Sequence, residues 1–306
     1  MSADFSLRLK ELRLRRALRQ KDLAAALGLA QTTIANYEQK LRFPDEGILI
    51  RIADYFGVSL DHLMGRDNGY TGAPTAPGAE EAVAGKEPPV PELAREYLAA
   101  FRALGTEAAR LVLQGAVSGG AGMRELYLDI FAPALREVGR LWALGELSVG
   151  EEHTFSEATQ RLMSQYFASA SFASPARPTG LRCVAASASG EAHLIGARMV
   201  ADFLAAAGWE VSFPGGNLSI HHLRELLIAR PPSLLALSVT MPINLNGASD
   251  LLRAIRGEVS LSGMRVMAGG QAFAARKLAG KDIGADATAD DAEGAVKAAK
   301  ELFGLT

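Results

Sequence analysis

The residues with the clearest chemical character lie in the segment SASGEAHLIGARM, which contains Glu191, His193 and Gly196 in the order acid-x-His-x-x-Gly. The segment follows a short apolar run, so we expect the histidine on a loop that leaves a strand. A carboxylate two residues before the histidine can accept the N–H of one ring nitrogen, which fixes the tautomer and makes the other nitrogen a better metal donor. Gly196 lets the backbone approach a bulky group. The pattern predicts a single metal-donating nitrogen at this loop.

Two later runs end with residues suited to a ligand pocket. The run LALSVT ends with Ser238 and Thr240, whose hydroxyls can form hydrogen bonds to a buried polar ligand. The run RVMAGG ends with Gly269 and Gly270, where side chains would fill a slot. Ligands of parallel sheets bind beyond the carboxyl ends of the strands, so these residues and the histidine loop are expected on one rim of a deep pocket.

This set of residues resembles the cobalamin-binding domain of methionine synthase and its relatives, whose motif is Asp-x-His-x-x-Gly, then Ser-x-Leu or Ser-x-Thr, then Gly-Gly. The resemblance implies that His193 replaces the cofactor's own benzimidazole on cobalt and that Glu191 orients the imidazole. Glu191 stands where that family has aspartate, which slightly lengthens the reach to the ring. The resemblance also implies that the pocket for the displaced tail of the cofactor is lined by Ser238, Thr240, Gly269 and Gly270.

The sheet that must position these residues is predicted from short apolar runs that alternate with helical stretches. Apolar strands between helices indicate a doubly wound parallel sheet of the Rossmann-like, flavodoxin-like class. Strands are expected at residues 181–188, 209–214, 233–240 and 265–270, with a weak fifth strand at ADATAD, and helices at 192–207, 218–229, 247–256, 271–279 and 291–303.

Ahead of the sheet, residues 92–175 carry apolar residues at helical spacing, which predicts a bundle of about four helices. Within it, Trp142 is followed after nine residues by Glu152 and His153. Taken alone, these are a core aromatic residue and a helix start. The spacing nevertheless resembles the helical caps of cobalamin-dependent photoreceptors, the light-sensing repressors of carotenoid genes. That resemblance implies that the three residues cover the upper face of the corrin and that the cofactor is adenosylcobalamin.

The resemblance to photoreceptors also implies a switch. Visible light cleaves the cobalt–carbon bond of adenosylcobalamin, and loss of the adenosyl group would let the bundle shift and change a subunit contact. Members of that family often have a histidine directly after the cap tryptophan, which takes the upper cobalt position after photolysis. This chain has Ala143 there, so we do not expect a two-histidine photoproduct built on that position, and His153 is a candidate substitute.

The amino-terminal residues 7–64 contain five short helical patterns. The second and third, at 20–27 and 31–39, are joined through Gly28 and a tight turn, which is the arrangement of a helix-turn-helix. Residues at helical spacing would pack the pair together: Ala24, Leu29, Ile34 and Tyr37. Small polar residues would then face outward, where they can form hydrogen bonds to base edges or phosphates: Gln31, Thr32, Thr33 and Asn36.

The whole segment, from RLKELR to the closing phrase VSLDHLMG, resembles the DNA-binding domain of the Cro and phage-repressor (Xre) type. The resemblance implies that Gln20 and Arg42 touch backbone phosphate and that Gln31, Thr32 and Asn36 read bases. The best-known photoreceptors of the type named above carry a winged MerR-like head instead. The alternative for this segment is a helical bundle that binds another protein.

Charge and composition divide the chain further. Residues 1–66 carry 11 Lys and Arg against 8 Asp and Glu, whereas the remaining residues carry 21 against 26. This indicates a polyanion partner for the first module alone, although a solvated helix face has the same charge. A Gly, Pro, Ala and Glu-rich stretch predicts a linker. The expected domains are a head at 1–67, a linker at 68–91, the cap at 92–175 and the sheet domain at 178–306.

Several protein classes are excluded by what the sequence contains. No apolar stretch reaches the roughly 18 residues of a membrane span, and the basic start lacks the apolar core of a signal peptide, so a cytoplasmic location is expected. A single cysteine, Cys183, cannot form an internal disulfide or a cysteine metal cluster and is expected to be buried. No nucleophile, base and acid set can be identified, so an enzyme is not expected.

These observations predict a transcription regulator, a repressor by the resemblance, that binds operator DNA as a dimer or tetramer and senses light through adenosylcobalamin on His193. Three alternatives stay open: a light-independent sensor of cobalamin supply, a corrinoid carrier for methyl transfer, and a protein whose pocket takes another tetrapyrrole such as haem.

Overall fold

A computed structural model describes residues 2–15, 18–56, 63–64, 89–169, 177–216, 218–276 and 280–305 of the chain. The chain divides into two compact units, Met1–Pro77 and Gly78–Thr306. The first corresponds to the head, and the second contains both the cap and the sheet domain.

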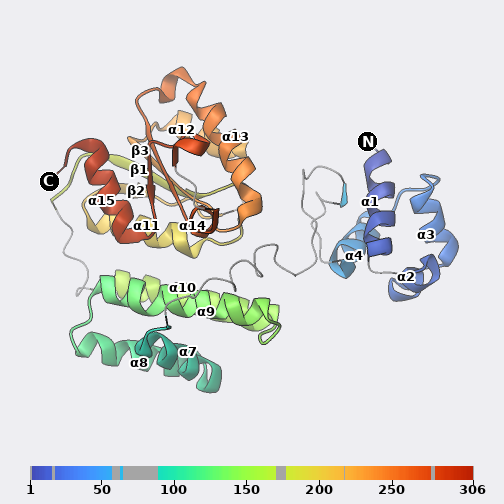
Figure 1. The fold of residues 1–306 in the computed structure, drawn as a ribbon, viewed down its shortest axis with the longest axis horizontal. Coiled ribbons are helices and arrows are strands. Elements are labelled where there is room, and N and C mark those ends of the chain that lie inside the picture. The colour runs from blue at the N-terminus through green and yellow to red at the C-terminus, as the bar shows by residue number, and fades with distance from the viewer. Residues whose placement is uncertain are drawn as a thin grey trace. The chain divides into compact units, whose positions relative to one another are not determined.

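The described part of the head is helical, as expected. Gly28 lies in the turn before the third helix with a φ of +61°, a conformation that glycine adopts without strain. Ala24, Ile34 and Tyr37 are buried between the helices, and Leu29 packs against the same core. The expected last helix over VSLDHLMG lies mostly outside the described residues. The helices are α1 (Ser2–Arg15), α2 (Gln20–Ala26), α3 (Gln31–Glu38) and α4 (Glu46–Phe56), shown in blue in Figure 1.

The cap is a helical bundle, which confirms the prediction for this region. Its core contains an aromatic cluster in which Tyr97 meets Phe131 and Phe155 edge to face, with ring centroids 5.6 and 5.5 Å apart. The segment Glu125–Phe131 is a π-helix that runs directly into the next α-helix, whereas the apolar spacing predicted only an ordinary helix there. The elements are α7 (Glu92–Leu104), α8 (Thr106–Ser118), the π-helix η1 (Glu125–Phe131), α9 (Ala132–Ala143) and α10 (Val149–Phe167).

The sheet domain has five parallel strands in the order β2-β1-β3-β4-β5. This is the flavodoxin-like order of a doubly wound sheet and confirms the predicted fold class. The strands are β1 (Arg182–Ser187), β2 (Glu210–Ser212), β3 (Leu234–Ser238), β4 (Arg265–Gly269) and β5 (Ala287–Ala289).

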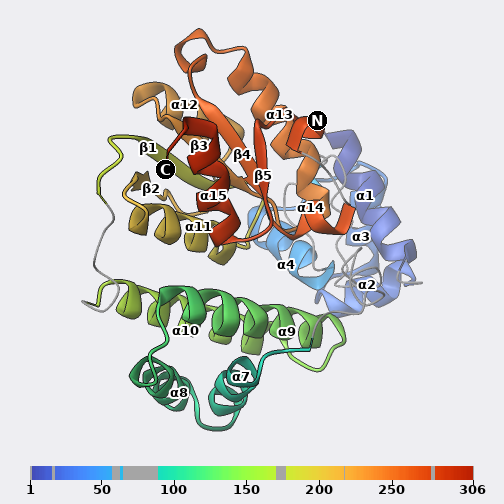
Figure 2. The same ribbon diagram turned by 60° about the vertical axis from the view of Figure 1, so that its left-hand side comes forward.

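Helices cover both faces of the sheet, as Figure 2 shows. The apolar side chains of α11 (Ile195–Ala206) and α15 (Ala292–Phe303) pack on one face, and those of α12 (Ile220–Ala229) and α13 (Leu245–Arg256) pack on the other. All five residues of β3 are buried, which explains its continuous apolar sequence. The short helix α14 (Gln271–Arg276) follows β4.

Cys183 lies in β1 and is buried, and burial raises the pKa of its thiol to about 12. A thiol in this state is protonated at neutral pH and unreactive. Among the described residues, no helix combines the length and the apolar character that a membrane crossing needs.

Candidate functional site

The loop between β1 and α11 joins Glu191 to His193. The His193 Nδ1 atom lies 2.5 Å from Glu191 Oε1, and the main-chain N–H of His193 donates to the same oxygen at 3.1 Å. The Glu191 side chain is fully buried, whereas 53% of the His193 side chain is exposed. No described residue forms a hydrogen bond with His193 Nε2. The loop therefore presents one imidazole nitrogen outward and fixes the other, as the sequence pattern predicts.

The second oxygen of Glu191 ties this loop to the end of β3. Oε2 accepts hydrogen bonds from the main-chain N–H groups of Thr240 at 3.0 Å and Met241 at 2.9 Å, and from Nδ2 of Asn244 at 3.0 Å. Asn244 ends a short 3-10 turn, Pro242–Asn244, and the sequence analysis did not identify it. Its only signal in the sequence is its place shortly after a predicted strand end.

Hydrogen bonding decides the protonation of this pair. Burial by itself raises the pKa of Glu191, but the hydrogen bonds from His193, Met241 and Asn244 outweigh it and hold the pKa at about 2. The hydrogen bond to Glu191 raises the pKa of His193 against the opposing effect of burial, and the negative charges of Glu191 and Glu152 raise it further. The carboxylate is therefore charged across the physiological range.

The other predicted residues of this edge also come together. Ser238 at the end of β3 lies beside Ser187 of β1 and Gly269 of β4 in the strand register. A Cβ atom added to Gly196 would lie 3.6 Å from Ser238 Oγ. The sheet therefore gathers the histidine loop, the serine and the glycine pair at its carboxyl edge.

The structure also gives the glycine pair a role in packing. A Cβ atom at Gly269 would collide with the main-chain carbonyl of Ala289, and one at Gly270 would collide with the carbonyl of Val239. Gly270 has a φ of +105°, which disfavours any other residue. Close contacts between strand ends are thus a second reason for glycine at these positions.

The three predicted residues of the cap lie near the start of α10 and the end of α9. Trp142 is half-buried against the cap core. Glu152 accepts a hydrogen bond from Ser156 at 2.8 Å, and its other oxygen lies 2.7 Å from Nδ1 of His153, whose side chain is 72% exposed. Since the charge of Glu152 raises the pKa of His193, the start of α10 and the histidine loop belong to one electrostatic environment.

In the head, the predicted DNA-reading residues lie on α3 and next to it. Gln31, Thr32 and Arg42 are exposed, and Thr33 and Asn36 are half-buried. These side chains are on the outside of the helix-turn-helix, while Ile34 and Tyr37 fill its inside.

Gln20, at the start of α2, is held by a buried ion pair that the sequence analysis missed. Glu38 of α3 accepts hydrogen bonds from Arg13 Nε at 2.6 Å and from Gln20 Nε2 at 2.8 Å. The side chains of Arg13 and Glu38 are only 9% and 3% exposed. Burial raises the pKa of Glu38, but the bonds from Arg13 and Gln20 lower it overall. An amide nitrogen carries two N–H donors, so the hydrogen bond to Glu38 uses one of them and leaves the other for the predicted phosphate contact.

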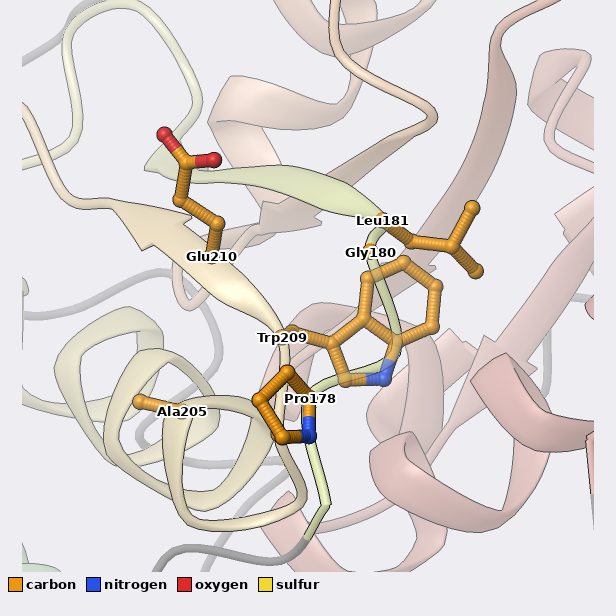
Figure 3. A pocket seen from close by; sticks show the side chains of 7 residues that line it. Pro178, Gly180, Leu181, Ala205, Trp209 and Glu210 are labelled. Atoms are coloured by element: carbon orange, nitrogen blue, oxygen red, sulfur yellow. The ribbon is translucent and has the colours of Figure 1, made fainter.

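Two cavities have none of the predicted site residues in their lining. One, of about 320 Å³, is at the amino-terminal ends of β1 and β2 and includes Leu181, Trp209 and Glu210 in its lining (Figure 3). The other, of about 540 Å³, lies in the cap between α7 and the start of α10 and includes Phe101, Arg102 and Phe155 in its lining. Neither contains a residue of the carboxyl edge.

Comparison with known families accounts for most of the chain. Residues 181–300 match a B12 binding domain family, residues 93–166 match a second B12 binding domain family, and residues 9–63 match a helix-turn-helix family. The chain belongs to the B12-binding proteins and carries a helix-turn-helix domain ahead of its two B12-binding parts.

Individual relatives match separate parts of the chain. The HTH-type transcriptional regulator ImmR of Bacillus subtilis is 37% identical over 60 residues, which are 20% of this chain and 47% of that protein. Dimethylamine corrinoid protein 3 of Methanosarcina mazei is 35% identical over 114 residues, which are 37% of this chain and 67% of that protein. The chain thus spans about half the length of the first of these curated relatives and of most of the other corrinoid proteins it matches.

A solved structure shows the same fold in the second unit. The monomethylamine corrinoid protein of Methanosarcina barkeri has a TM-score of 0.57 at 19% identity, and the match covers 70% of this chain and 97% of that one. The combination of a DNA-binding and two B12-binding families supports a cobalamin-binding transcription regulator.

Proposed function

We propose that the chain is a transcription regulator in which α3 reads operator DNA and adenosylcobalamin, bound through His193, sets DNA occupancy in response to light. The observation that carries this proposal is the buried Glu191 carboxylate, which holds Nδ1 of a half-exposed histidine in a chain that also has a helix-turn-helix. A lone imidazole with a fixed tautomer and an outward Nε2 suits the single axial position of a corrin cobalt.

On the lower side of the cofactor, each residue has a separate task. Glu191 keeps the Nδ1 proton and so leaves Nε2 as the donor atom. Thr240 and Ser238 offer hydroxyls to the displaced tail, and Gly269 and Gly270 keep the edge free of side chains. These roles need the residues at one edge of the sheet, where the strand register brings them.

On the upper side, we propose that Trp142, Glu152 and His153 cover the cofactor. The cofactor supplies a cobalt–carbon bond that visible light cleaves, which frees the space that the adenosyl group fills. Loss of that group would remove a packing partner of these cap residues and would let the cap shift on the sheet domain. Because Ala143 has no donor atom, His153 is the candidate that would replace the family's histidine as a ligand after illumination.

DNA binding requires two copies of the head. Helix-turn-helix proteins bind half-sites about one helical turn apart, so we propose a dimer or tetramer in which two α3 helices enter successive major grooves. Separation of the two heads forfeits their avidity, and this would release the operator. We propose repression as the outcome of binding.

The test compares full-length protein loaded with adenosylcobalamin in darkness, before and after green light. Absorption spectra, elution volume and affinity for a selected operator are measured on the same sample. We expect stoichiometric binding, loss of the adenosyl spectrum on illumination, a changed elution volume and a lower operator affinity. His193→Ala should abolish ligation of cobalt by the protein, whereas His222→Ala, which changes an exposed histidine of the same domain, should not.

The other outcomes select other functions. Equal DNA affinity in darkness and light, with a difference between apo and loaded protein, would identify a sensor of cobalamin supply. A second candidate, favoured by the similarity to dimethylamine corrinoid proteins, is a corrinoid carrier. Absence of DNA binding together with transfer of a methyl group to the bound cobalt would support it and overturn the proposal.

A further inference from the structure

The cap and the sheet domain are joined by a buried polar contact that no motif of the cofactor site includes. Tyr127 of η1 donates a hydrogen bond through its hydroxyl to Oδ2 of Asp202 in α11, at 2.8 Å. Tyr127 is 1% exposed and Asp202 is 5% exposed. Arg198 of α11 donates through Nε to both carboxylate oxygens at 2.9 and 3.0 Å and through another nitrogen to Ser164 of α10 at 3.4 Å. We name Tyr127, Ser164, Arg198 and Asp202 the cap latch.

Apolar contacts surround the cap latch. The Tyr127 ring lies 5.7 Å from that of Phe203, and Met199 of α11 is buried in the core of the cap. Figures 1 and 2 both show α9 and α10 as the layer of the cap that faces α11. A polar contact inside an apolar interface specifies one arrangement, because any slip leaves the carboxylate buried without its donors.

Tyr127 lies in the π-helix η1. Leu126, Tyr127, Ile130 and Phe131 are all buried within its seven residues. The Tyr127 and Phe131 rings meet edge to face at 5.7 Å. Phe131 also packs on Tyr97 in the cap, and the Tyr127 hydroxyl reaches Asp202. π-Helical turns occur often at functional sites. Arg124, just before the π-helix, forms an exposed ion pair with Glu293 of α15 at 3.0 Å, so this end of the cap has a second contact with the sheet domain.

The helix that carries Arg198 and Asp202 begins directly after the histidine loop. α11 starts at Ile195, two residues beyond His193, and the N–H of Arg198 donates to the carbonyl of Leu194. On the cap side of the Tyr127–Asp202 hydrogen bond, η1 continues into α9, whose penultimate residue is Trp142. Tyr127 and Asp202 therefore lie on two helical segments, of which one begins just after His193 and the other ends just after Trp142.

We infer that Tyr127 and Asp202 are positioning residues that set the place of the cap beside the cofactor edge. In the described structure their hydrogen bonds reach neither the histidine loop nor Trp142, Glu152 and His153, so they act through α11 and α9. Burial raises the pKa of Asp202 even though Tyr127 and Arg198 donate to it. The inference that this contact belongs to a light switch rests on the proposed function, but cap docking itself does not.

Tyr127→Phe tests the cap latch, and Tyr97→Phe is its matched control. Tyr97 is also fully buried and its hydroxyl also forms one hydrogen bond, at 2.9 Å to Thr159, but both residues are within the cap. The probe is full-length protein loaded with hydroxocobalamin, and the measurement is the rate at which added cyanide replaces the upper ligand, followed by absorbance. Removal of a hydrogen bond to a charged group should shift cap docking, and therefore this rate, by about 10- to 100-fold.

We expect the faster exchange in Tyr127→Phe alone, with Tyr97→Phe within about twofold of wild type. Equal rates in both variants and wild type, at unchanged circular dichroism, would overturn the inference, and so would an equal increase in both. A double substitution with Asp202→Asn should give less than the product of the two separate effects, because the residues act as a pair.

Failure of the proposed function gives a different pattern. If wild type binds no cobalamin, the proposed function is wrong, and the cap latch is then tested on the apo protein by hydrogen exchange. Faster exchange of the α11 amides in Tyr127→Phe than in Tyr97→Phe supports the latch, and equal exchange refutes it.

Discussion

Replacement of Glu191 by glutamine would show whether the buried carboxylate keeps His193 in the tautomer that we propose binds cobalt. The side chain accepts two hydrogen bonds on Oε1, both from His193, and three on Oε2, from the loop after β3. Glutamine preserves the shape but offers one acceptor oxygen and one NH₂ donor. The three donors at Oε2 are expected to keep the oxygen, so the NH₂ group faces His193.

This orientation changes the histidine. The main-chain N–H of His193 loses its acceptor, and Nδ1 must accept a hydrogen bond from the amide instead of donating one. The ring proton then moves to Nε2, and the nitrogen that would bind cobalt no longer has a free lone pair. We expect cobalamin bound by the variant to keep its own benzimidazole on cobalt.

The stability of the apo protein should fall as well. A buried donor left without an acceptor costs about 1–3 kcal/mol, and a hydrogen bond to an ionised group contributes about 1.5–3 kcal/mol. The pKa of Glu191, about 2 against an ordinary 4.5, gives a similar figure of about 3 kcal/mol at neutral pH. We therefore expect the free energy of unfolding to fall by about 3 kcal/mol.

The two pKa shifts fix how this loss depends on pH. The pKa of Glu191 is lowered, so its contribution is complete above the ordinary value of 4.5 and disappears as the pH falls toward about 2. The pKa of His193 is raised, so its contribution is complete below the ordinary value of 6.5 and disappears as the pH rises through the folded value. The difference between wild type and variant should be largest between these two ordinary values.

Urea unfolding of the apo protein at about pH 3, 5.5 and 8 measures the profile, and a cobalamin titration followed by absorbance reports the axial ligand. Glu210→Gln is the control, because Glu210 lies in the same domain but is 59% exposed in its ion pair with Arg230. The control should change stability by less than about 0.5 kcal/mol. Equal urea midpoints for wild type and Glu191→Gln near pH 5.5, or equal ligation of cobalt by the protein, would refute the reasoning.

Three further predictions concern other parts of the chain. Asn36→Ala should weaken operator binding by about 1–3 kcal/mol and relax sequence specificity. Arg42→Ala should weaken binding to all DNA sequences and lower the slope of log affinity against log salt concentration by about 1 in anisotropy titrations. If both variants lose affinity equally for all sequences, Asn36 does not read bases. Gly270→Ala should lower the free energy of unfolding by more than about 3 kcal/mol, and Gly105→Ala should lower it by about 1–2 kcal/mol, as measured by thermal unfolding. Both glycines have positive φ, but only a Cβ at Gly270 would collide with a main-chain carbonyl. Arg13→Met should cost about 3–5 kcal/mol, since it leaves a buried carboxylate unpaired, and an unchanged unfolding temperature of the head would contradict this.

The sequence predicted those parts of the fold whose signals are local. The apolar runs that form β1, β3 and β4 are short and bounded by helical stretches, and the residues at their carboxyl ends indicate the histidine loop, Ser238 and the glycine pair. The Glu191–His193 contact was predictable because the two residues are separated by one position. Local spacing also predicted the helix-turn-helix.

Contacts between distant segments were not predictable in this way. Asn244 is 53 positions from Glu191, and Asp202 is 75 positions from Tyr127. Nothing in either local pattern distinguishes these residues from other polar residues near a strand end or on a helix. The π-helix that contains Tyr127 is as apolar as an ordinary buried helix, so the spacing of apolar residues in the sequence does not reveal its wider turn.

The strength of the cap latch bears on how many chains a switch needs. To change the ratio of docked to undocked cap from 1:99 to 99:1, the equilibrium constant of docking must change by a factor of about 10⁴. Loss of one hydrogen bond to a charged group changes that constant by about 10- to 100-fold. One chain therefore gives at most about half of the required range on a logarithmic scale. Two chains with coupled docking equilibria multiply their factors, and two α3 helices are also what an operator with two half-sites requires. In the proposed function, an assembly of at least two chains would therefore serve DNA recognition and the sharpness of the response together, and a variant locked as a monomer should bind the operator weakly in darkness and in light alike.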